Sequence, residues 1–248
     1  MIIIKILHIN SYYYSSSVHQ QLQLFLHDHN IESSTYAPVS KGYVGRNECA
    51  FGCEDYVKKS ECYNKVDRYF FHIKHQKILN DILRHYDAKN FHCIHAHSLF
   101  SNGYVARQLK MRWSIPYIVA VRDTDINVFF KRMLHLRKLG RQILQDASKI
   151  VFLSIGARDN VLDNYVPSEL RNSLLAKSII IPNGIDDFWL QNKFLPKNIK
   201  KRKSIRLLHV GAISKRKNLL NTAKAVEILI EKGYDVQYTG VPWVRRTR

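Results

Sequence analysis

The stretch IIIKILHI, residues 2–9, opens the chain, and YIVAV at residues 117–121 and SIIIP at residues 178–182 repeat its character. Short, continuous runs of β-branched and other apolar residues are typical of strands buried on both faces, as in a parallel sheet covered by helices. Longer segments of helical period separate these runs. The alternation predicts an α/β fold, with a Rossmann-like, doubly wound parallel sheet built from βα units.

Six apolar runs are predicted as strands and five longer segments as helices, and together they form one complete domain over residues 1–187. The strands are expected at residues 2–9, 31–37, 91–95, 116–122, 150–154 and 178–181. The helices are expected at residues 18–29, 69–86, 102–113, 127–147 and 156–165.

The composition indicates a folded and strongly basic protein. Of 248 residues, 46% are hydrophobic, which excludes a disordered chain, and 39 Lys+Arg against 20 Asp+Glu leave a net charge of +19. No apolar run approaches the roughly 20 residues that cross a bilayer. The first ten residues lack a basic segment and a cleavage site, so we interpret them as a strand rather than a signal peptide. The four cysteines are too few for a disulfide framework, which favours a reducing cytoplasm.

A second unit is expected after residue 187. Residues 188–204 are rich in lysine and arginine and are predicted as a basic linker. A new βαβ unit then begins, with a strand at 205–210, a helix at 218–232 and a strand at 234–239. Only 44 residues follow Ser204, which is too few to close a core of their own. We therefore expect residues 205–248 to be the start of an incomplete second domain.

Four motifs, in this order, resemble those of the family 4 glycosyltransferases, which have the GT-B fold of two Rossmann-like domains facing each other across a cleft. They are IHAH (94–97), VRDTD (121–125), IPNGID (181–186) and VGAISKRKN (210–218). The resemblance implies that residues 1–187 are the acceptor-side domain and residues 205–248 the beginning of the donor-binding domain. It implies retaining transfer of a sugar from a nucleotide-sugar co-substrate to a glycan or lipid-linked acceptor, as in polysaccharide biosynthesis, with no other cofactor and no metal.

The donor phosphates are expected at the start of the predicted helix 218–232. Free backbone N–H groups and the positive end of a helix dipole meet Lys215, Arg216 and Lys217 there, after the strand that ends at Gly211. By resemblance, Lys217 matches the phosphate-binding lysine of the family. The family often has an arginine where this chain has Ala212. The alternative interpretation is a solvated basic start of a helix.

Arg122 and Asp125 are the predicted catalytic residues, because the family commonly has His-Gly-Thr-Asp where this chain has Arg-Asp-Thr-Asp at residues 122–125. The site follows a strand, where doubly wound sheets bind ligands. Asp123 in place of glycine departs from the family pattern. Two structural alternatives stay open. Asp125 caps the helix that follows, which we rank first for this residue, and Arg122 pairs with Asp123 or Asp125.

The acceptor side is assigned to His97, Asn10 and Ser11. The family has a similar histidine pair where this chain has His95 and His97, and His95 is expected to be partly buried. The loop NSYYYSSS, residues 10–17, replaces a glycine-rich loop of the family. Its tyrosines and serines suit a hydroxyl-rich ligand, and an ordinary surface loop is the alternative.

Cysteines 49, 53 and 62 with histidines 72 and 75 do not match the paired spacing of a zinc site, so no metal site is expected there. We expect reduced thiols in a connecting segment.

The basic, amphipathic segment 127–141 suggests contact with an anionic membrane, and packing of its apolar residues on the sheet is the alternative. We expect most of its apolar residues to pack and its charges to face the membrane, peripherally at the cytoplasmic side.

Two rival functions remain. Nucleic acid would suit the charge, but no recognition motif supports it, so no nucleic-acid partner is expected. A sugar-nucleotide epimerase of GT-B architecture keeps the fold and changes the reaction. In full-length family members, later glutamates of the second domain hold the donor, so we expect this chain alone to be weakly active or inactive. Turnover above that of Lys217→Ala would overturn that expectation.

Overall fold

The computed structural model describes residues 4–44, 54–185, 187–193 and 204–242 of the chain. By its internal contacts, the chain divides into two compact units, Met1–Gln191 and Asn192–Arg248. The expected linker at 188–204 lies mostly outside the described residues. Each unit is described by itself below.

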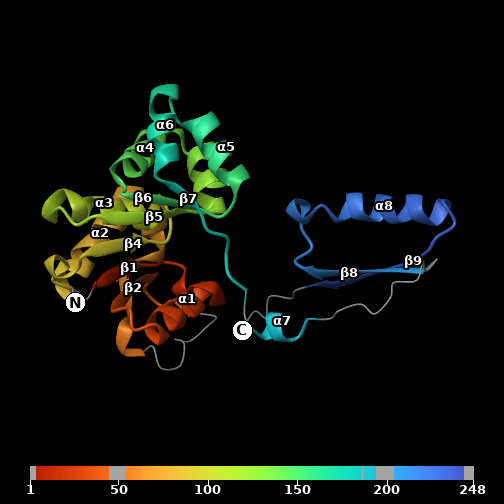
Figure 1. The fold of residues 1–248 in the computed structure, drawn as a ribbon, viewed down its shortest axis with the longest axis horizontal. Coiled ribbons are helices and arrows are strands. Elements are labelled where there is room, and N and C mark those ends of the chain that lie inside the picture. Colours follow the sequence, from red (N-terminus) through yellow and green to blue (C-terminus); the bar gives the residue numbers. More distant parts are fainter. Residues whose placement is uncertain (1–3, 45–53, 186, 194–203, 243–248) are drawn as a thin grey trace. The chain divides into compact units, whose positions relative to one another are not determined.

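The first unit is built on a sheet of seven parallel strands in the order β3-β2-β1-β4-β5-β6-β7, flanked by helices (Figure 1). This confirms the predicted doubly wound α/β fold. The strands are β1 (Ile6–Ile9), β2 (Ser33–Ser40), β3 (Val57–Tyr63), β4 (Cys93–Ala96), β5 (Tyr117–Val121), β6 (Lys149–Phe152) and β7 (Ser178–Ile180).

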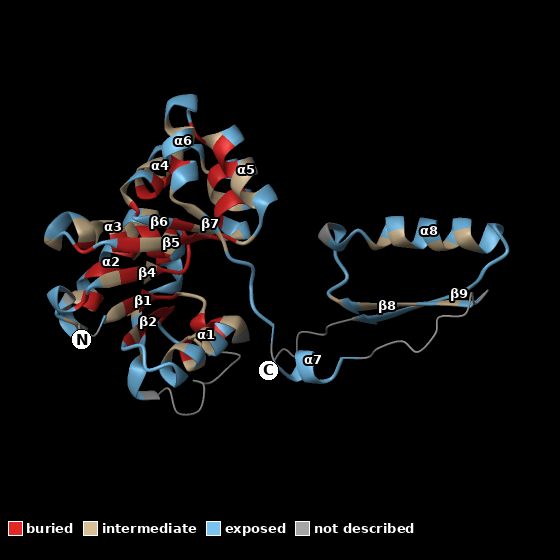
Figure 2. Cartoon of the chain, viewed as in Figure 1, coloured by how far each residue is buried: buried red, intermediate tan, exposed pale blue. Residues whose placement is uncertain are grey.

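The helices of this unit follow the strands along the chain. They are α1 (Ser17–Asp28), α2 (Phe71–His85), α3 (Ser101–Trp113), α4 (Arg137–Asp146), α5 (Ile155–Tyr165), α6 (Ser168–Ala176) and α7 (Asp187–Gln191). Short 3-10 helices cover Tyr13–Ser15, Glu54–Tyr56, Lys65–Tyr69, Ala88–Asn90 and Leu134–Leu136. Buried residues concentrate in the central strands and the helix faces against them (Figure 2). Removing this apolar surface from water supplies most of the free energy that stabilises the unit.

Strand β3 was not predicted, because its sequence VKKSECY is too polar to resemble a buried run. It forms the edge of the sheet, where only one neighbour is present, and its exposed Lys58 and Lys59 are typical of edge strands that resist pairing with other chains.

The predicted helix 127–147 is interrupted. Residues Asp125–Phe130 are π-helical, and Met133, with φ −103° and ψ 73°, leaves helical geometry before α4 begins. The side chains of Phe129, Met133 and Leu139 pack against the core, whereas Leu134 is 63% exposed. Packing of most apolar residues, the alternative to membrane contact for these side chains, is therefore confirmed.

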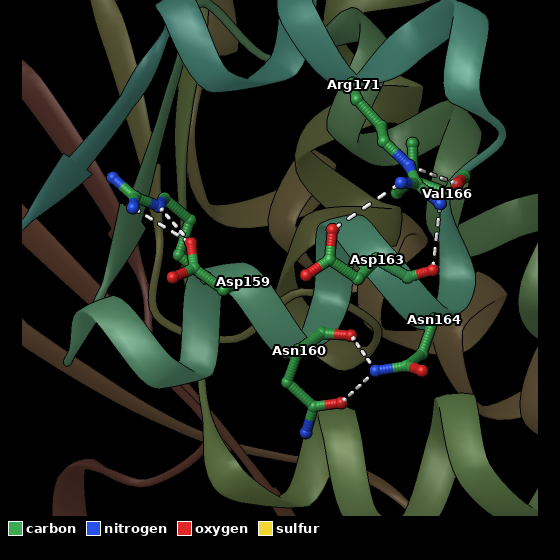
Figure 3. A network of polar contacts seen from close by, with 7 residues as sticks. Asp159, Asn160, Asp163, Asn164, Val166 and Arg171 are labelled. Atoms are coloured by element: carbon green, nitrogen blue, oxygen red, sulfur yellow. Dashed lines mark hydrogen bonds and ion pairs between the residues drawn. The ribbon is translucent and has the colours of Figure 1, made fainter.

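Helix α6 was also not predicted, and a polar network joins it to α5 (Figure 3). Arg171 of α6 donates to the carbonyls of Asp163 (3.0 Å) and Val166 (3.4 Å) at the end of α5, and its guanidinium lies 3.6 Å from the Asp163 carboxylate. Carbonyls in the last turn of a helix lack intrahelical donors, so Arg171 satisfies two of them.

The second unit contains β8 (Ser204–Gly211), a 3-10 turn (Lys215–Lys217), α8 (Leu219–Glu231) and β9 (Asp235–Pro242). The two strands pair in parallel. In this unit no described residue of α8 is buried. Across the described ranges of the whole chain, no helix is long and apolar enough to span a bilayer.

Candidate functional site

The candidate site lies at the carboxyl ends of β1 and β4. These two strands are neighbours in the sheet but not in the sequence. From β1 the chain continues to β2 and β3 on one side of β1, and it then returns to form β4 on the other side of β1. Doubly wound sheets bind ligands at such a point, where the strand order reverses. His8 and His95 are register partners there, and Asn10 and His97 follow the two strand ends.

Arg122, directly after β5, joins three of the sequence motifs. Its Nε donates to the backbone carbonyl of His97 (3.1 Å), and its Nη1 donates to Oδ1 of Asn183 (2.9 Å). IHAH, VRDTD and IPNGID therefore converge on one guanidinium. Both acceptors are neutral, and within the described chain no ion pair joins Arg122 to Asp123 or Asp125, so that alternative is wrong. Burial lowers the pKa of Arg122 and the nearby Asp125 carboxylate opposes this shift.

Asp125 is buried and connects two loops. Its Oδ2 accepts from the backbone N–H groups of Leu99 (3.0 Å) and Arg122 (2.9 Å), and its Oδ1 accepts from that of Phe100 (3.1 Å). Burial raises the pKa of Asp125 to about 6, against the lowering effect of these three N–H groups and of the Arg122 charge. The interpretation ranked first for Asp125, that it caps the helix that follows it, is wrong. Its carboxylate oxygens accept instead from the backbone N–H groups of Leu99 and Phe100, before α3, and of Arg122.

The loop after β1 is folded onto the end of the sheet. Asn10 is 1% exposed and accepts from the backbone N–H of Tyr12 (3.1 Å), while Ser11 donates to Oδ1 of Asn102 in α3 (2.8 Å). Tyr13 and Tyr14 are buried in a small second core. This is not an ordinary surface loop, and its two buried tyrosines are not available to stack on a ligand.

A cluster of four histidines adjoins Arg122. Nδ1 of His8 and Nε2 of His97 share a hydrogen bond of 3.0 Å, the ring of His95 stacks on that of His97 at 4.1 Å, and His19 of α1 meets His97 edge-on at 5.2 Å. Burial, with the Arg122 charge, lowers the pKa of His19 and of His95 to about 4 each. It also lowers the pKa values of His8 and His97, so the cluster is neutral near pH 7.

Several of these residues were missed by sequence reasoning. No motif in the sequence marks four of them as site residues: His8, His19, Asn102 and Asn183. Asn183 does lie within IPNGID. Tyr12, in the first loop, stacks on His19 with ring centroids 6.2 Å apart, and burial raises its pKa to about 12. Only the packing of the loops brings these side chains together.

The predicted donor residues lie in the second unit. Gly211 ends β8 with φ 153°, a backbone conformation that residues with a side chain rarely adopt. Lys215 and Lys217 are exposed in the 3-10 turn that also contains Arg216. Asn218 precedes α8 without a side-chain capping bond, so the first N–H groups of α8 have no side-chain acceptor from it.

Two members of the proposed thiol and histidine set, Cys49 and Cys53, lie outside the described residues. Cys62 is a half-buried free thiol, and burial raises its pKa. His75 is buried and donates from Nδ1 to the Phe71 carbonyl at 2.6 Å. The expected absence of zinc at this set stays a prediction.

Residues 69–171 match the sequence profile of the glycosyl transferase 4-like domain. The matched segment contains His95, His97, Arg122 and Asp125, the motif residues at the ends of β4 and β5. No curated protein sequence matches the chain significantly.

Solved structures of similar fold include a putative UDP-N-acetylglucosamine 2-epimerase from Listeria monocytogenes, with 12% identity and a TM-score of 0.52, covering 99% of this chain and 64% of that one. The S. aureus MnaA–UDP structure aligns with 13% identity and a TM-score of 0.50, covering 98% and 63%. At this identity the likeness concerns the fold alone. The chain spans less than two thirds of the length of either structure.

Proposed function

We propose that the protein is a retaining glycosyltransferase that moves a sugar from a nucleotide-sugar donor to a glycan or lipid-linked acceptor. The observation that carries the proposal is the meeting of three motifs at Arg122, within the segment that matches the glycosyl transferase 4-like domain. Its hydrogen-bond acceptors are neutral, so the guanidinium keeps its positive charge beside the switch point of the sheet, near the Asp125 carboxylate.

In this proposal Arg122 stabilises the negative charge that develops on the departing diphosphate. A positive group already in position needs no rearrangement when that charge appears, which lowers the barrier. Asp125 acts by holding the loops after β4 and β5 together, and so fixes where Arg122 stands. Ser11, which is partly exposed, is proposed to contact the acceptor, and the buried Asn10 and His97 complete the acceptor side by holding the loops around it.

The donor diphosphate is proposed to bind Gly211, Arg216 and Lys217 in the second unit. A glycine at the strand end, exposed cations and the start of α8 suit an anion. Calorimetric titration of the full chain with UDP tests this. We expect Lys217→Ala to weaken binding and Lys224→Ala, an exposed lysine of α8, to leave it unchanged. Equal affinity of both variants and the wild type would contradict the donor assignment.

A panel of nucleotide sugars with product analysis tests the reaction. The chain alone is expected to be weakly active at most, and we expect any turnover to be transfer or hydrolysis of the donor sugar. Arg122→Gln should lower that rate by about 100- to 1,000-fold, the usual cost of removing one group that stabilises developing charge. Arg112→Gln, at an exposed arginine near the end of α3, should keep the wild-type rate. A wild-type rate in Arg122→Gln would exclude the proposed role.

UDP-sugar epimerisation is the second candidate, since one structure of similar fold described above is a putative UDP-N-acetylglucosamine 2-epimerase and the other is a co-structure with UDP. A product that keeps its nucleotide and changes one sugar centre would favour it over transfer.

The proposed partners are the nucleotide sugar, the acceptor and an anionic membrane surface at the cytoplasmic side. Lys131, Arg132 and Lys138 are exposed around the π-helical segment and α4, as contact with such a surface requires. Sedimentation with anionic vesicles over a series of salt concentrations, compared with binding to DNA over the same series, tests the membrane surface as a partner. We expect the protein to bind the vesicles more tightly than DNA.

A further inference from the structure

Three histidines stand on one face of the sheet at its switch point. His8 of β1 and His95 of β4 are register partners, and side chains two residues apart along a strand point to the same face, so His97 joins them. His97 follows the end of β4, but its backbone N–H donates to the carbonyl of Ile9. This hydrogen bond keeps His97 in line with the strand. Their placement is therefore set by strand pairing rather than by flexible side chains.

The three rings are close enough to share one ligand. Each offers a ring nitrogen, and these nitrogens all lie within 4.8 Å of one another. Nδ1 of His8 and Nε2 of His97 are already 3.0 Å apart. Imidazole nitrogens around a tetrahedral zinc ion stand about 3.3 Å from one another, since each is about 2.0 Å from the metal. A bound zinc ion would draw the three nitrogens from within 4.8 Å to about that spacing.

The rings are also shielded from solvent. His8 and His97 are 3% and 2% exposed, and imidazole is a common metal ligand in its neutral form. The other nitrogens of the facing pair, Nε2 of His8 and Nδ1 of His97, are buried without a hydrogen-bond partner within the described part of the chain, and they lie on the far side of each ring from the shared position.

We propose that His8, His95 and His97 bind a first-row divalent metal ion of the kind that prefers imidazole, such as Zn²⁺, with an open fourth position. This site differs from the cysteine-containing set that the sequence offers, and it does not depend on whether the chain transfers a sugar. It consists of one cation held by three neutral nitrogens.

Arg122 gives the proposal a distinctive electrostatic signature. Its guanidinium binds the His97 carbonyl, and its positive charge acts on His95 and His97. The same charge opposes a bound metal cation. Removing it should therefore tighten metal binding, which is not expected for a metal held by histidines elsewhere on the surface.

Calorimetric titration of the chelator-treated full chain with Zn²⁺ tests the site. We expect one ion per chain in the wild type. In His95→Gln we expect binding at least about 100-fold weaker, because even a supporting partner of a ligand can cost that much. Arg122→Gln should bind Zn²⁺ more tightly. His135→Ala, at an exposed histidine, should equal the wild type.

The X-ray absorption spectrum of the zinc-loaded wild type adds a measurement that needs no variant to fold. We expect nitrogen and oxygen neighbours with the scattering of imidazole rings, and no sulfur. Absence of a stoichiometric site in the wild type, sulfur ligation, or unchanged affinity in a folded His95→Gln would each overturn the proposal.

Discussion

Asp125 shows how one carboxylate can fix the loops of a site. Three backbone N–H groups, from Leu99, Phe100 and Arg122, depend on it, and the side chain is 1% exposed. In Asp125→Ala these donors lose their acceptor in a place that water does not reach. Each such loss costs about 1–3 kcal/mol. We expect the free energy of unfolding to fall by at least about 3 kcal/mol in urea denaturation.

Asp123 provides the matched control for this prediction. It is exposed, and among the described residues its carboxylate accepts from the side chain of Asn127 alone (2.7 Å). Asp123→Ala should change the free energy of unfolding by no more than about 0.5 kcal/mol. Similar losses in the two variants would mean that Asp125 does not hold the loops as described.

His75 makes stability depend on pH. It is 2% exposed on α2, and burial, with the neighbouring Lys74 charge, lowers its pKa from 6.5 to about 3. Between these values the unfolded chain binds a proton that the folded chain does not. The stability is therefore present above pH 6.5 and is lost as the pH falls toward 3. From pH 7 to pH 4 this histidine removes about 3 kcal/mol.

His75→Phe should reduce that acid loss. The ring lies against those of Phe71 (centroids 4.1 Å apart) and Tyr104 (5.7 Å), where phenylalanine suits the surroundings and cannot be protonated. Urea denaturation at pH 7 and pH 4 measures the effect, with His72→Phe at the exposed neighbouring histidine as control. An unchanged difference between the two pH values in His75→Phe would refute the argument.

At the scale of elements, α4 packs closely because of Gly140. A Cβ atom at this position would stand 2.6 Å from Cζ of Phe100 and 2.9 Å from the ring of Phe130, and both rings are fully buried. Gly140→Ala must displace one of them. Overpacking of this kind costs about 1–3 kcal/mol, which thermal or urea denaturation measures.

Gly156 in α5 is the control, because nothing lies within 4 Å of a Cβ built there. Alanine is preferred over glycine within helices by about 1 kcal/mol. Gly156→Ala should therefore leave stability unchanged or raise it. If Gly140→Ala also stabilises the protein, the close approach of α4 to Phe100 is not present in solution.

Most elements of the first unit could be predicted from periodicity, because buried strands and amphipathic helices differ in the spacing of apolar residues. The exceptions have physical causes. Edge strand β3 is polar, since it is not covered on both sides by neighbours. The segment from Asp125 to Asp146 keeps a helical pattern of apolar residues, yet its backbone changes at Met133, where tertiary packing decides the path.

At the scale of the whole molecule, the sequence predicts the order of the motifs but not their contacts. Arg122 and Asn183 are 61 residues apart, and His8 and His97 are 89 apart, so neither pair can be predicted from local spacing. The strand order brings them together, because these residues lie at or just after the carboxyl ends of four strands of one sheet: β1, β4, β5 and β7. The role of His8 needed this topology, since within IIIKILHI it is simply one residue of a buried strand.

The hydrogen bond between His8 and His97 has a consequence for the tautomers of both rings. One proton lies between Nδ1 of His8 and Nε2 of His97, so two neutral rings can arrange their remaining proton in only two ways. In each arrangement one of the outward nitrogens is an N–H donor and the other is a bare acceptor. A donor placed against one outward nitrogen thereby makes the other a donor. The pair relays hydrogen-bonding character across the end of the sheet without any change in its charge.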